Sequence, residues 1–516
     1  MVEFNMNTLK HTVIIPTAGL GSRLGKLSED INKSLLPYKF KPVIANIIDQ
    51  FPKDTRFIIP VGYKAEQVKD FCQLVYSDRD VEFVLIDDYT SVKSGPGYTV
   101  SKCIDRIDSP FWYIPCDTYF DENITDYNFT EDVVFVKSVP ENLSSMYTMF
   151  NVENNKILDI TFKEKQNTTW LAFTGVMFVH DWKNFNDRLK KENSPEIIWA
   201  IEKGTKTIDL QSWQDLGNLE IYKTLTTQNQ KYDFTKTDEY TFICNNKVVK
   251  WWKDHTIAKK KYEKTLFNPT VFPNNCTYKN SWLTYDFCPG TVVYENHNLA
   301  MLNDMLHWMD SNLWIHSSTD IKDTALKFYK EKTLSRIDKF LKKYPNIEEA
   351  KTINGTIVKH WQYYFDKIDW NLLIDNNLPA FIHGDLQFDN IIKTDNDFKI
   401  IDWRHEFADQ IEIGDLYYDL AKLTGGLIIN YSEIKENNFT FKNHDGHITL
   451  EIPYIDNHQE YIQVIEKFVK EKGWNYDKVK LLIPIIFWNM SPLHTPPFDK
   501  FLWYLAIKLF EELKYD

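Results

Sequence analysis

The sequence lacks the features that mark secreted and membrane proteins. Its 516 residues include six cysteines, and no two stand in a Cys-x-x-Cys pair, so we expect a reducing compartment rather than a disulfide framework. Residues 1–16 show no charged region leading into a long apolar one, so no signal peptide is predicted. No apolar run approaches the roughly 20 residues that cross a bilayer, and the longest candidate, 481–488, suits a buried helix. These absences predict a cytoplasmic protein with no membrane partner.

Basic residues are outnumbered as well. Lys and Arg total 60 against 73 acidic residues, which gives a net charge of −13. A nucleic-acid-binding protein normally carries a basic face, so this balance argues against nucleic acid as a partner. An anionic small molecule must then be held by a local device, such as a glycine loop, a helix N-terminus or a metal ion. The length exceeds what one hydrophobic core usually serves, so we expect two or three domains.

Short β-branched segments alternate with helical patterns over the first 110 residues. This alternation is typical of βαβ units and predicts an α/β fold with a parallel sheet. From about 132 to 180 the pattern changes to successive strands, which indicates a meander added to the parallel core. The expected strands of the first part are 11–18, 56–63, 81–88 and 111–117, and the expected helices are 42–51, 65–75 and 99–107.

A glycine-rich segment, TAGLGSRLGKLSEDINKSLLP at 17–37, directly follows the first expected strand. Glycines at 19 and 21 allow backbone N–H groups to approach a triphosphate, as phosphate-binding loops require. Arg23 supplies a guanidinium and Lys33 a point charge, and together they can neutralise phosphates. The segment therefore predicts a nucleotide-binding loop.

The fuller pattern resembles the sugar-phosphate nucleotidyltransferase signature, in which Gly-x-Gly-Ser/Thr-Arg leads to Pro-Lys. Here Asn32 replaces the proline before Lys33. The resemblance implies a Rossmann-like domain with a mixed sheet of the GT-A type over 1–225, with Arg23 and Lys33 as catalytic residues. It also implies that the nucleotide is contacted by Gly19, Leu20, Gly21, Ser22, Gly95 and Gly97.

Three downstream features agree with that resemblance, and the third is the order of the segments 162–165, 173–178 and 212–222, which matches the substrate half of this family. The glycine turn at 94–103 resembles the element that reads the nucleobase in this family. Asp117 ends an apolar strand, where ligands bind in open α/β sheets. By resemblance, Asp117 and Asp215 hold a Mg²⁺ ion beside the α-phosphate, which suits an ion that takes one or two carboxylates plus phosphate oxygens. Lys165 is expected to contact the substrate phosphate.

The second half of the chain has a different organisation. The polar stretch 223–236 is the best linker candidate, and helical patterns dominate from about 300 onward. The run KKKYEK at 259–264 is expected to be a solvated helix face rather than a binding patch. Between linker and C-terminus we expect a hairpin over 237–253, a strand over 381–385 and a second hairpin over 390–403.

The segment FIHGDLQFDNII at 381–392 contains Asp385 and Asn390, and Asp402 follows in KIIDWRHEF. Phosphoryl transfer from ATP needs a carboxylate that orients the acceptor hydroxyl and oxygen ligands for Mg²⁺. This pattern resembles the aminoglycoside phosphotransferase and choline kinase family. The resemblance implies that Asp385 is the catalytic base, that Asn390 and Asp402 bind the metal, and that His383 braces the loop. Asp415 and Asp419 are expected to be structural anchors.

The same resemblance implies a bilobal, protein-kinase-like α+β domain over 230–516. Its small lobe would span about 230–290 and its helical lobe about 291–516. Lys250 is the expected phosphate ligand, and Glu263 is the expected partner of Lys250. Lys247 is the alternative phosphate ligand. The segment around Asp286 resembles the hinge that binds adenine.

Together the two modules predict consecutive reactions on small-molecule substrates. A kinase would phosphorylate a sugar or polyol hydroxyl with ATP, and a transferase would couple that phosphate to CTP, UTP or GTP, with CTP the first choice. The product would be an activated precursor for a capsule or surface glycan. The sequence predicts neither the acceptor nor the oligomeric state.

Two alternatives stay open at this stage. The kinase substrate could be choline or ethanolamine, giving CDP-choline or its analogue, which would need an aromatic cage. Alternatively, one module could be inactive and the protein regulatory, although the intact catalytic residues of both modules argue against this. The candidate cage residues, whose helical spacing is more typical of a core than of a cage, are Trp361, Tyr363, Tyr364, Trp370, Trp488, Trp503 and Tyr504.

Overall fold

The structure of the protein is a computed structural model. The chain forms two compact units. The first comprises Met1–Gln228 with Tyr240–Lys253, and the second comprises Asn229–Glu239 with Asp254–Asp516. The described residues are 11–91, 93–192, 194–227, 238–295, 298–455 and 457–513.

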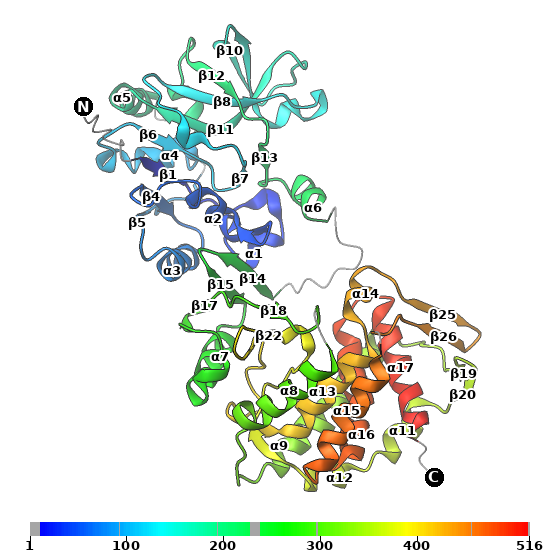
Figure 1. The fold of residues 1–516 in the computed structure, drawn as a ribbon. Helices are drawn as coiled ribbons and strands as arrows, with labels where there is room; N and C mark the ends of the chain where they lie inside the picture. The colour runs from blue at the N-terminus through cyan, green and yellow to red at the C-terminus, as the bar shows by residue number, and fades with distance from the viewer. Residues whose placement is uncertain are drawn as a thin grey trace. The chain divides into compact units, whose positions relative to one another are not determined.

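A nine-stranded mixed sheet forms the core of the first unit (Figure 1). Its first four strands pair in parallel, as the alternation of strands and helices predicts. Antiparallel pairs then extend the sheet, which confirms a mixed α/β fold with added strands. In spatial order the strands are β5 (Asp80–Leu85), β4 (Arg56–Val61), β1 (Thr12–Ile14), β6 (Phe111–Tyr113), β11 (Leu171–Val179), β8 (Val133–Lys137), β12 (Lys206–Asp209), β10 (Lys156–Phe162) and β9 (Thr148–Glu153).

The helices of this unit are short and amphipathic. The expected helix over 65–75 is confirmed as α3 (Ala65–Val75), and the one over 42–51 as the shorter α2 (Val43–Ile48). The expected helix over 99–107 is wrong at both ends, because α4 spans Pro96–Ser101. Proline suits the first turn of a helix, where its missing N–H is not needed, so α4 begins earlier than its apolar pattern indicates.

A β-hairpin after residue 237 is confirmed as β14 (Glu239–Cys244) and β15 (Lys247–Trp252). Asn245 and Asn246 form its turn with φ of 48° and 55°, the left-handed conformation that two-residue hairpin turns require. The hairpin bonds to the first unit, since Asn245 Nδ2 and Lys247 Nζ donate to carbonyls at the end of α3, at 2.6 and 2.8 Å. The expected linker starts inside α6 (Leu219–Thr227), and its remainder lies outside the described residues.

The second unit is mainly helical after residue 298, as the sequence predicts (Figure 1). Helical backbone runs unbroken over 322–343, with a π-helical stretch at 326–331 between α9 (Lys322–Ala325) and α10 (Lys332–Lys343). Its other helices of seven residues or more are α7 (His255–Phe267), α8 (Leu299–Trp308), α11 (Trp361–Lys367), α13 (Leu416–Ile428), α15 (His458–Glu471), α16 (Tyr476–Met490) and α17 (Phe498–Glu512).

Short strand pairs connect these helices. The expected hairpin over 390–403 is confirmed as β22 (Ile391–Lys393) and β23 (Phe398–Ile400). The expected strand over 381–385 ends early, because β21 spans Pro379–Phe381 and pairs with β24 (Ile413–Asp415). His383 to Asp385 therefore lie in the loop that leaves the strand. His383 and Gly384 are buried there, whereas Asp385 is partly exposed, so a ligand can reach the Asp385 side chain.

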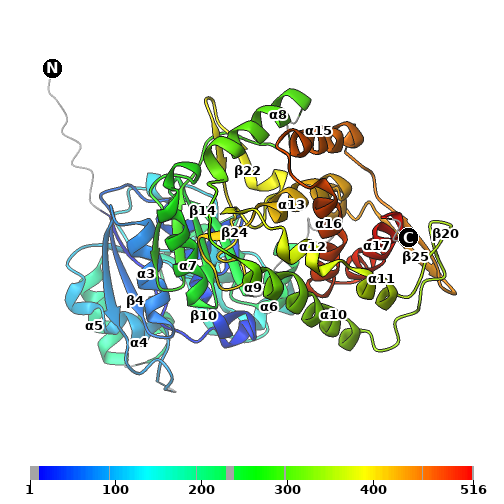
Figure 2. The same cartoon turned by 90° about the horizontal axis from the view of Figure 1, so that it is seen from below.

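The core of the second unit includes the contact between α16 and α17, which both Figure 1 and Figure 2 show side by side. Segment 481–488 is buried inside α16, as expected. Lys478 and Asp415 form an ion pair of 2.8 Å in which both side chains are fully buried. Tyr329 also donates to the Asp415 carboxylate, at 2.8 Å. No helix among the described residues is long and apolar enough to cross a membrane.

Close backbone contact at Gly95 leads to a prediction about stability. A Cβ added there would lie 2.4 Å from the carbonyl oxygen of Pro195. We expect Gly95→Ala to lower the free energy of unfolding of the first unit by about 1–3 kcal/mol, the usual cost of overpacking. Denaturant unfolding measures this. Gly19→Ala is the control, because nothing lies within 4 Å of its Cβ, and equal stability of the two variants would contradict the expectation.

Candidate active sites

The loop that follows β1 leaves its glycines open to solvent. Gly19 and Leu20 are exposed, whereas Leu24 is buried and anchors the loop. Gly21 has φ of 69°, in the left-handed region that glycine adopts without strain. Its carbonyl accepts a hydrogen bond of 3.0 Å from the hydroxyl of Ser28. The chain is therefore held in a tight turn whose outer face presents backbone groups, as a phosphate-binding loop requires.

Asn32 fixes the position of Lys33. It is fully buried, and its side-chain amide donates to the carbonyls of Thr17 and Tyr63 at 3.0 and 2.7 Å. Its side-chain oxygen accepts the N–H of Ser34 at 3.0 Å, capping the short helical turn that carries Lys33. The asparagine thus fastens the turn to the loop after β1. This gives a structural reason for its presence at the position where the resembled family has proline.

Two predicted carboxylates come together at the carboxyl end of β6. Asp117 follows that strand, and Asp215 ends β13 (Gln214–Asp215), which pairs with β7 (Thr118–Tyr119). The N–H of Leu216 donates to the Asp117 carbonyl at 2.8 Å. Asp215 in turn accepts the N–H of Gly217 at 2.8 Å and the hydroxyl of Tyr147 at 3.1 Å. Pairing of these two short strands therefore sets the two carboxylates beside each other.

Lys33 and Arg23 complete this cluster. Lys33 Nζ lies 2.7 Å from Asp117 Oδ2, and Arg23 Nη2 lies 3.9 Å from the same oxygen. The Arg23 side chain remains 59% exposed while that of Lys33 is 18% exposed. Arg23 is therefore free to turn toward a ligand, whereas Lys33 is held by Asp117. The structure brings together four residues that the sequence singles out.

The electrostatics of the two carboxylates differ. Burial opposes ionisation of Asp117, but the adjacent Lys33 ammonium outweighs it and holds the pKa of Asp117 below its usual range. Burial raises the pKa of Asp215, and the neighbouring Asp117 charge raises it further. Two adjacent carboxylates of this kind repel each other, and a cation between them would relieve the repulsion.

The donor set fits a Mg²⁺ ion. Asp117 and Asp215 offer two oxygen ligands, and this ion takes its remaining ligands from water and phosphate oxygens. Among the described residues, no group of three or more His, Cys, Asp or Glu side chains could hold a metal ion by itself. The site therefore suits an ion that arrives with a nucleotide rather than one caged by protein.

The other predicted site residues of this unit contact neighbouring protein groups. Gly97 donates its N–H to the Pro195 carbonyl at 2.7 Å, so this glycine, like Gly95, packs against neighbouring backbone. Lys165 is exposed and pairs with Glu141 at 3.1 Å. Its role toward substrate phosphate stays a prediction. Sequence reasoning did not find Tyr147, because no recognisable motif surrounds it.

In the second unit, α13 holds the loop that carries Asp385. The backbone N–H groups of His383 and Gly384 donate to the carboxylate of Asp419 at 2.8 and 2.7 Å. Asp415 accepts the N–H of Tyr417 and so caps the same helix. Both aspartates are fully buried. This geometry agrees with the expectation that they are structural anchors.

The His383 ring fixes its own protonation state through its partners. Its Nδ1 accepts the N–H of Asp385 at 3.1 Å, so the proton resides on Nε2, which donates to the Ile401 carbonyl at 2.8 Å. Burial lowers the pKa of His383 from 6.5 to about 4, although the carbonyl at Nε2 opposes the shift. A neutral imidazole therefore links the Asp385 loop to the segment that carries Asp402, which is the bracing role we expect of it.

Asp385 forms a contact that the sequence did not indicate. Lys422 Nζ lies 2.6 Å from Asp385 Oδ1. Lys422 is 6% exposed and Asp385 is 41% exposed, so the carboxylate can be reached from solvent while its cation cannot. Burial raises the pKa of Asp385, but Lys422 and then Arg404 outweigh it and hold that pKa well below the usual range. Lys422 lies 37 residues after Asp385 in the sequence. It belongs to the segment with Asp415 and Asp419, which we singled out for those two aspartates alone.

The two predicted metal ligands belong to the same network. The Asn390 side-chain amide donates to the Asp385 backbone carbonyl at 2.9 Å, and the Asn390 backbone carbonyl accepts the N–H of Ile401, also at 2.9 Å. Asp402 follows with φ of 58°, a strained conformation that clusters at functional sites. One amide oxygen and one carboxylate fit a Mg²⁺ ion that is also bound by phosphates.

The helix face over 259–264 is mostly not solvated, so that expectation is largely wrong, although the Lys259 side chain is 58% exposed. Lys261 and Lys264 are 9% and 1% exposed, and they donate to the carbonyls of Trp403 and Arg404. Lys260 pairs with Glu406 at 2.6 Å. Because lysine tips can satisfy backbone carbonyls inside a protein, a basic run need not face water. These bonds fasten α7 to the chain just after Asp402.

The remaining predictions for this unit are only partly addressed. Glu263 pairs with Lys259 one turn earlier, at 3.6 Å. Lys250 is buried in β15 and belongs to the first unit, so its role as phosphate ligand and its pairing with Glu263 stay predictions. Asp286 ends β17 (Trp282–Asp286) and accepts a hydrogen bond from Asn275 at 2.8 Å.

Most of the candidate cage aromatics belong to the hydrophobic core. Trp488, Trp503 and Tyr504 are at most 2% exposed. Trp503 stacks on Phe340 with 4.4 Å between ring centroids, and Trp488 packs on Phe510 at 4.5 Å. Tyr364 is also buried and donates to Glu511. These rings have no open face for a quaternary ammonium, so they do not form the cage that choline would need.

Gly217 offers a test of the Asp117 geometry. A Cβ at this position would lie 2.5 Å from Asp117 Oδ2 and 3.2 Å from Arg23 Nη2. We expect Gly217→Ala to displace the carboxylate and to lower nucleotide turnover by about 100-fold, as misplacement by 1 Å does. Steady-state kinetics measure this, with circular dichroism as the folding control. Unchanged kcat/KM in a folded variant would show that Asp117 is not needed in its present position.

His383 generates a prediction about pH. Its folded-state pKa is lowered, so its contribution to stability is complete above pH 6.5 and is lost as pH falls toward 4. We expect His383→Gln to destabilise the second unit at pH 7.5, and the difference from wild type to shrink by about 3 kcal/mol at pH 4. Hydrogen exchange of residues 381–392 measures this. A difference from wild type that is the same at pH 7.5 and pH 4 in His383→Gln would refute the assignment.

Comparison with known proteins concerns the N-terminal part of the chain. It is 28% identical over 251 residues to the bifunctional protein GlmU of Methanocaldococcus jannaschii, covering 46% of this chain and 58% of that protein. It is 25% identical over 179 residues to the D-glycero-α-D-manno-heptose 1-phosphate guanylyltransferase of Campylobacter jejuni, covering 34% of this chain and 77% of that enzyme. The chain spans 58% and 51% of the length of two such GlmU proteins.

Solved structures give weaker likenesses. A UDP-glucose pyrophosphorylase bound to UDP-glucose is 17% identical with a TM-score of 0.36, over 42% of this chain and 98% of that one. The CTP:phosphocholine cytidylyltransferase of Streptococcus pneumoniae is 21% identical with a TM-score of 0.35, over the same shares. These TM-scores are too low to support a conclusion about this chain. No family model matches the chain. The sequence comparisons nevertheless make the N-terminal part of this protein similar to GlmU proteins and to one sugar-phosphate guanylyltransferase, which supports a nucleotidyltransferase part.

Proposed function

We propose that the protein is a bifunctional enzyme that phosphorylates a small alcohol and then couples the new phosphate to a nucleotide. The observation that carries the proposal is the presence of two separate carboxylate–lysine clusters. One is Asp117 with Lys33, beside an open glycine loop. The other is Asp385 with Lys422, in one hydrogen-bonded network with Asn390. The similarity of the N-terminal part to nucleotidyltransferases supports the assignment of the first cluster.

The first cluster suits nucleotidyl transfer. An oxygen of the phosphate monoester attacks the α-phosphorus of the nucleotide, the bond to the β-phosphate oxygen breaks, and pyrophosphate leaves. Gly19 and Gly21 would cradle the triphosphate, and Arg23 would turn its exposed guanidinium onto it. Asp117 and Asp215 would hold Mg²⁺, which supplies charge neutralisation at the phosphates. No covalent enzyme intermediate is needed, so positioning and electrostatics supply the catalysis.

The second cluster suits phosphoryl transfer from ATP. Asp385 would accept a hydrogen bond from the acceptor hydroxyl, whose oxygen attacks the γ-phosphorus while ADP leaves with the bridging oxygen. The hydroxyl proton passes to Asp385 as the new P–O bond forms. Because Lys422 lowers the pKa of Asp385, this carboxylate is a weak base that orients the hydroxyl and takes the proton late. Asn390 and Asp402 would hold Mg²⁺, which neutralises charge on the phosphates.

A sugar or polyol acceptor is favoured over choline. The aromatic residues considered for a choline cage pack mainly in the core of the second unit. The guanylyltransferase relative acts on a sugar 1-phosphate by its name, which makes GTP a candidate beside CTP and UTP. An activated sugar or polyol for a capsule or surface glycan is the corresponding product.

Single substitutions should separate the two activities. We expect Asp385→Asn to lower the rate of acceptor-dependent ADP release by at least about 1,000-fold. Pyrophosphate release from an added sugar phosphate should continue in this variant. We expect Asp117→Asn to do the reverse. The assay supplies Mg-ATP with sugars, polyols, choline and ethanolamine, and then each nucleoside triphosphate. The exposed Asp395→Asn serves as control.

The outcomes are distinct. Loss of both activities in each variant would mean that the two clusters are not separate active sites. Turnover of choline alone would replace the sugar or polyol with choline. If the wild-type protein binds neither ATP nor any other nucleoside triphosphate, the proposed function is wrong.

A further inference from the structure

Basic side chains surround the proposed catalytic base. Lys332 on α10 and Arg404 after β23 both lie against the ring of Phe328, with Lys332 Nζ at 3.7 Å and Arg404 Cζ at 5.2 Å from its centroid. Arg404 also packs on Gly384, the residue before Asp385, where an added Cβ would lie 2.7 Å from the Arg404 Cβ. Arg336 follows Lys332 by one helical turn and so shares its face of α10.

The aromatic contacts hold these cations in place. Phe328 stacks on Phe407 with 3.9 Å between centroids and contacts Tyr418 edge-on at 4.9 Å. Phe328 belongs to the π-helical stretch at 326–331, directly before Lys332. Such stretches are rare in proteins overall, and those that occur are often found at functional sites. The helix thus departs from regular α-geometry where it approaches Asp385.

Asp385 balances only part of the positive charge of this group. Within the described part of the chain, no carboxylate lies within 4.0 Å of the charged nitrogens of Lys332, Arg336 or Arg404, and their side chains form no hydrogen bonds. Lys422 is already paired with Asp385. Burial lowers the pKa of Lys332 well below its usual value, and Arg404, Arg336 and Lys422 lower it further. Like charges gathered without counter-ions cost stability, which a bound anion would restore.

We infer that the acceptor of the proposed kinase is an anionic alcohol, a hydroxyl compound whose carboxylate or phosphate group is bound by Lys332, Arg336 and Arg404. The inference rests on the proposed function, because it places the acceptor hydroxyl at Asp385. Arginine forks and lysine ammonium groups are suited to both anions. A quaternary ammonium such as choline would be repelled at the same position.

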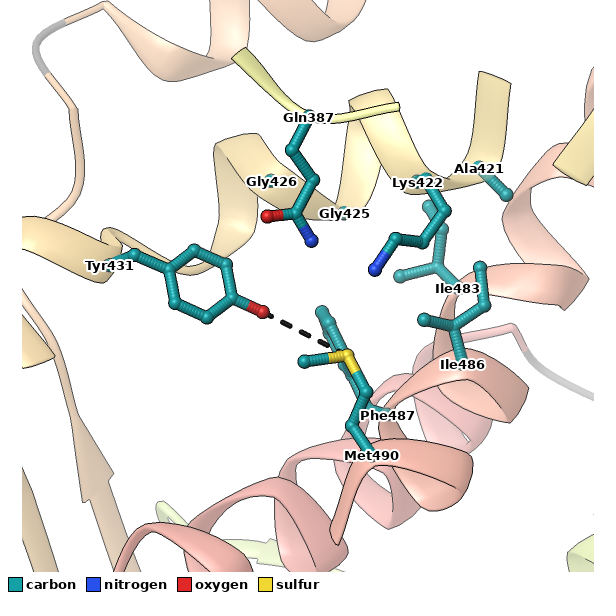
Figure 3. Close-up of a pocket in the computed structure, with 10 residues that line it drawn as sticks. All are labelled: Gln387, Ala421, Lys422, Gly425, Gly426, Tyr431, Ile483, Ile486, Phe487 and Met490. Atoms are coloured by element: carbon teal, nitrogen blue, oxygen red, sulfur yellow. Dashed lines mark hydrogen bonds between the residues drawn. The ribbon is translucent and has the colours of Figure 1, made fainter. Parts of the chain in front are cut away.

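Lys422 is left out of this anion site for a reason that Figure 3 makes visible. Its ammonium points into a small recess beside Gln387 and Tyr431, with Met490 and other apolar side chains of α16 forming the opposite wall. The recess offers apolar walls rather than further cations. We assign Lys422 to Asp385, and the three remaining cations to the acceptor.

Matched acceptors test the inference. Glycerol, D-glycerate and glycerol 3-phosphate form one set, and D-glucose, D-gluconate and glucose 6-phosphate form another, with ADP release as the readout. We expect the anionic members to exceed their neutral counterpart in kcat/KM by at least about 10-fold, the value of one charge-assisted contact. The carboxylate and phosphate members show which anion is recognised. A neutral acceptor, or choline, that exceeds every anionic acceptor would overturn the inference.

Variants locate the anion site. We expect Arg336→Gln and Lys332→Met each to raise the acceptor KM about 10-fold or more while the KM for ATP stays within about two-fold. Lys339→Gln, an exposed position on the same helix, is the matched control and should change neither. A rise in the KM for ATP instead would show that the cations serve the nucleotide phosphates, and the inference would fail.

A binding measurement separates this inference from the kinase assignment. Inorganic phosphate is titrated calorimetrically into the full-length protein saturated with Mg-ADP. We expect binding to wild type and a loss of at least about 10-fold in affinity in the Lys332→Met/Arg336→Gln double variant. Equal phosphate affinity in wild type and the double variant, or no phosphate binding to wild type, would contradict the anion site. If phosphate binding depends on Lys332 and Arg336 but the protein does not bind ATP, the anion site stands and the proposed kinase function is wrong.

Discussion

Both candidate sites depend on a lysine ammonium held against a functional carboxylate. Lys33 lies 2.7 Å from Asp117 and Lys422 lies 2.6 Å from Asp385. Removing a carboxylate from water costs several kcal/mol, and a lysine at this distance with further hydrogen bonds offsets much of that cost. The surrounding framework serves these pairs. Asn32 caps the turn that carries Lys33, and Asp419 accepts the two N–H groups that position Asp385.

The two lysines keep their carboxylates charged, and this shapes the chemistry that each site can perform. A carboxylate with a depressed pKa is a poor base but a good ligand and a good hydrogen-bond acceptor. Both reactions proposed here are phosphorus transfers, in which positioning and charge neutralisation matter more than early proton removal. Asp215, whose pKa burial and Asp117 raise, is the member that a metal ion would affect most.

The sequence predicts those parts of the sites that are encoded locally. The glycine loop after β1 and the group His383, Asp385 and Asn390 are contiguous motifs, so spacing alone indicates their shared position. Lys422 escaped notice because its partner lies 37 residues away and α13 supplies the geometry. The basic run at 259–264 was misjudged for a related reason. Periodicity cannot show that the carbonyls of residues 403 and 404 need donors. The early start of α4 is encoded locally by Pro96, a signal that the apolar pattern alone does not include.

The β14–β15 hairpin makes the first unit discontinuous in sequence. The chain leaves this unit at residue 228, returns for 240–253 and leaves it again. The last carbonyls of α3, at Leu74 and Val75, receive their donors only from this returning segment. During synthesis the first unit therefore cannot complete these hydrogen bonds until Lys247 has emerged. A gene division near residue 230 would separate those carbonyls from their partners, so each activity is best isolated by substitution within the intact chain.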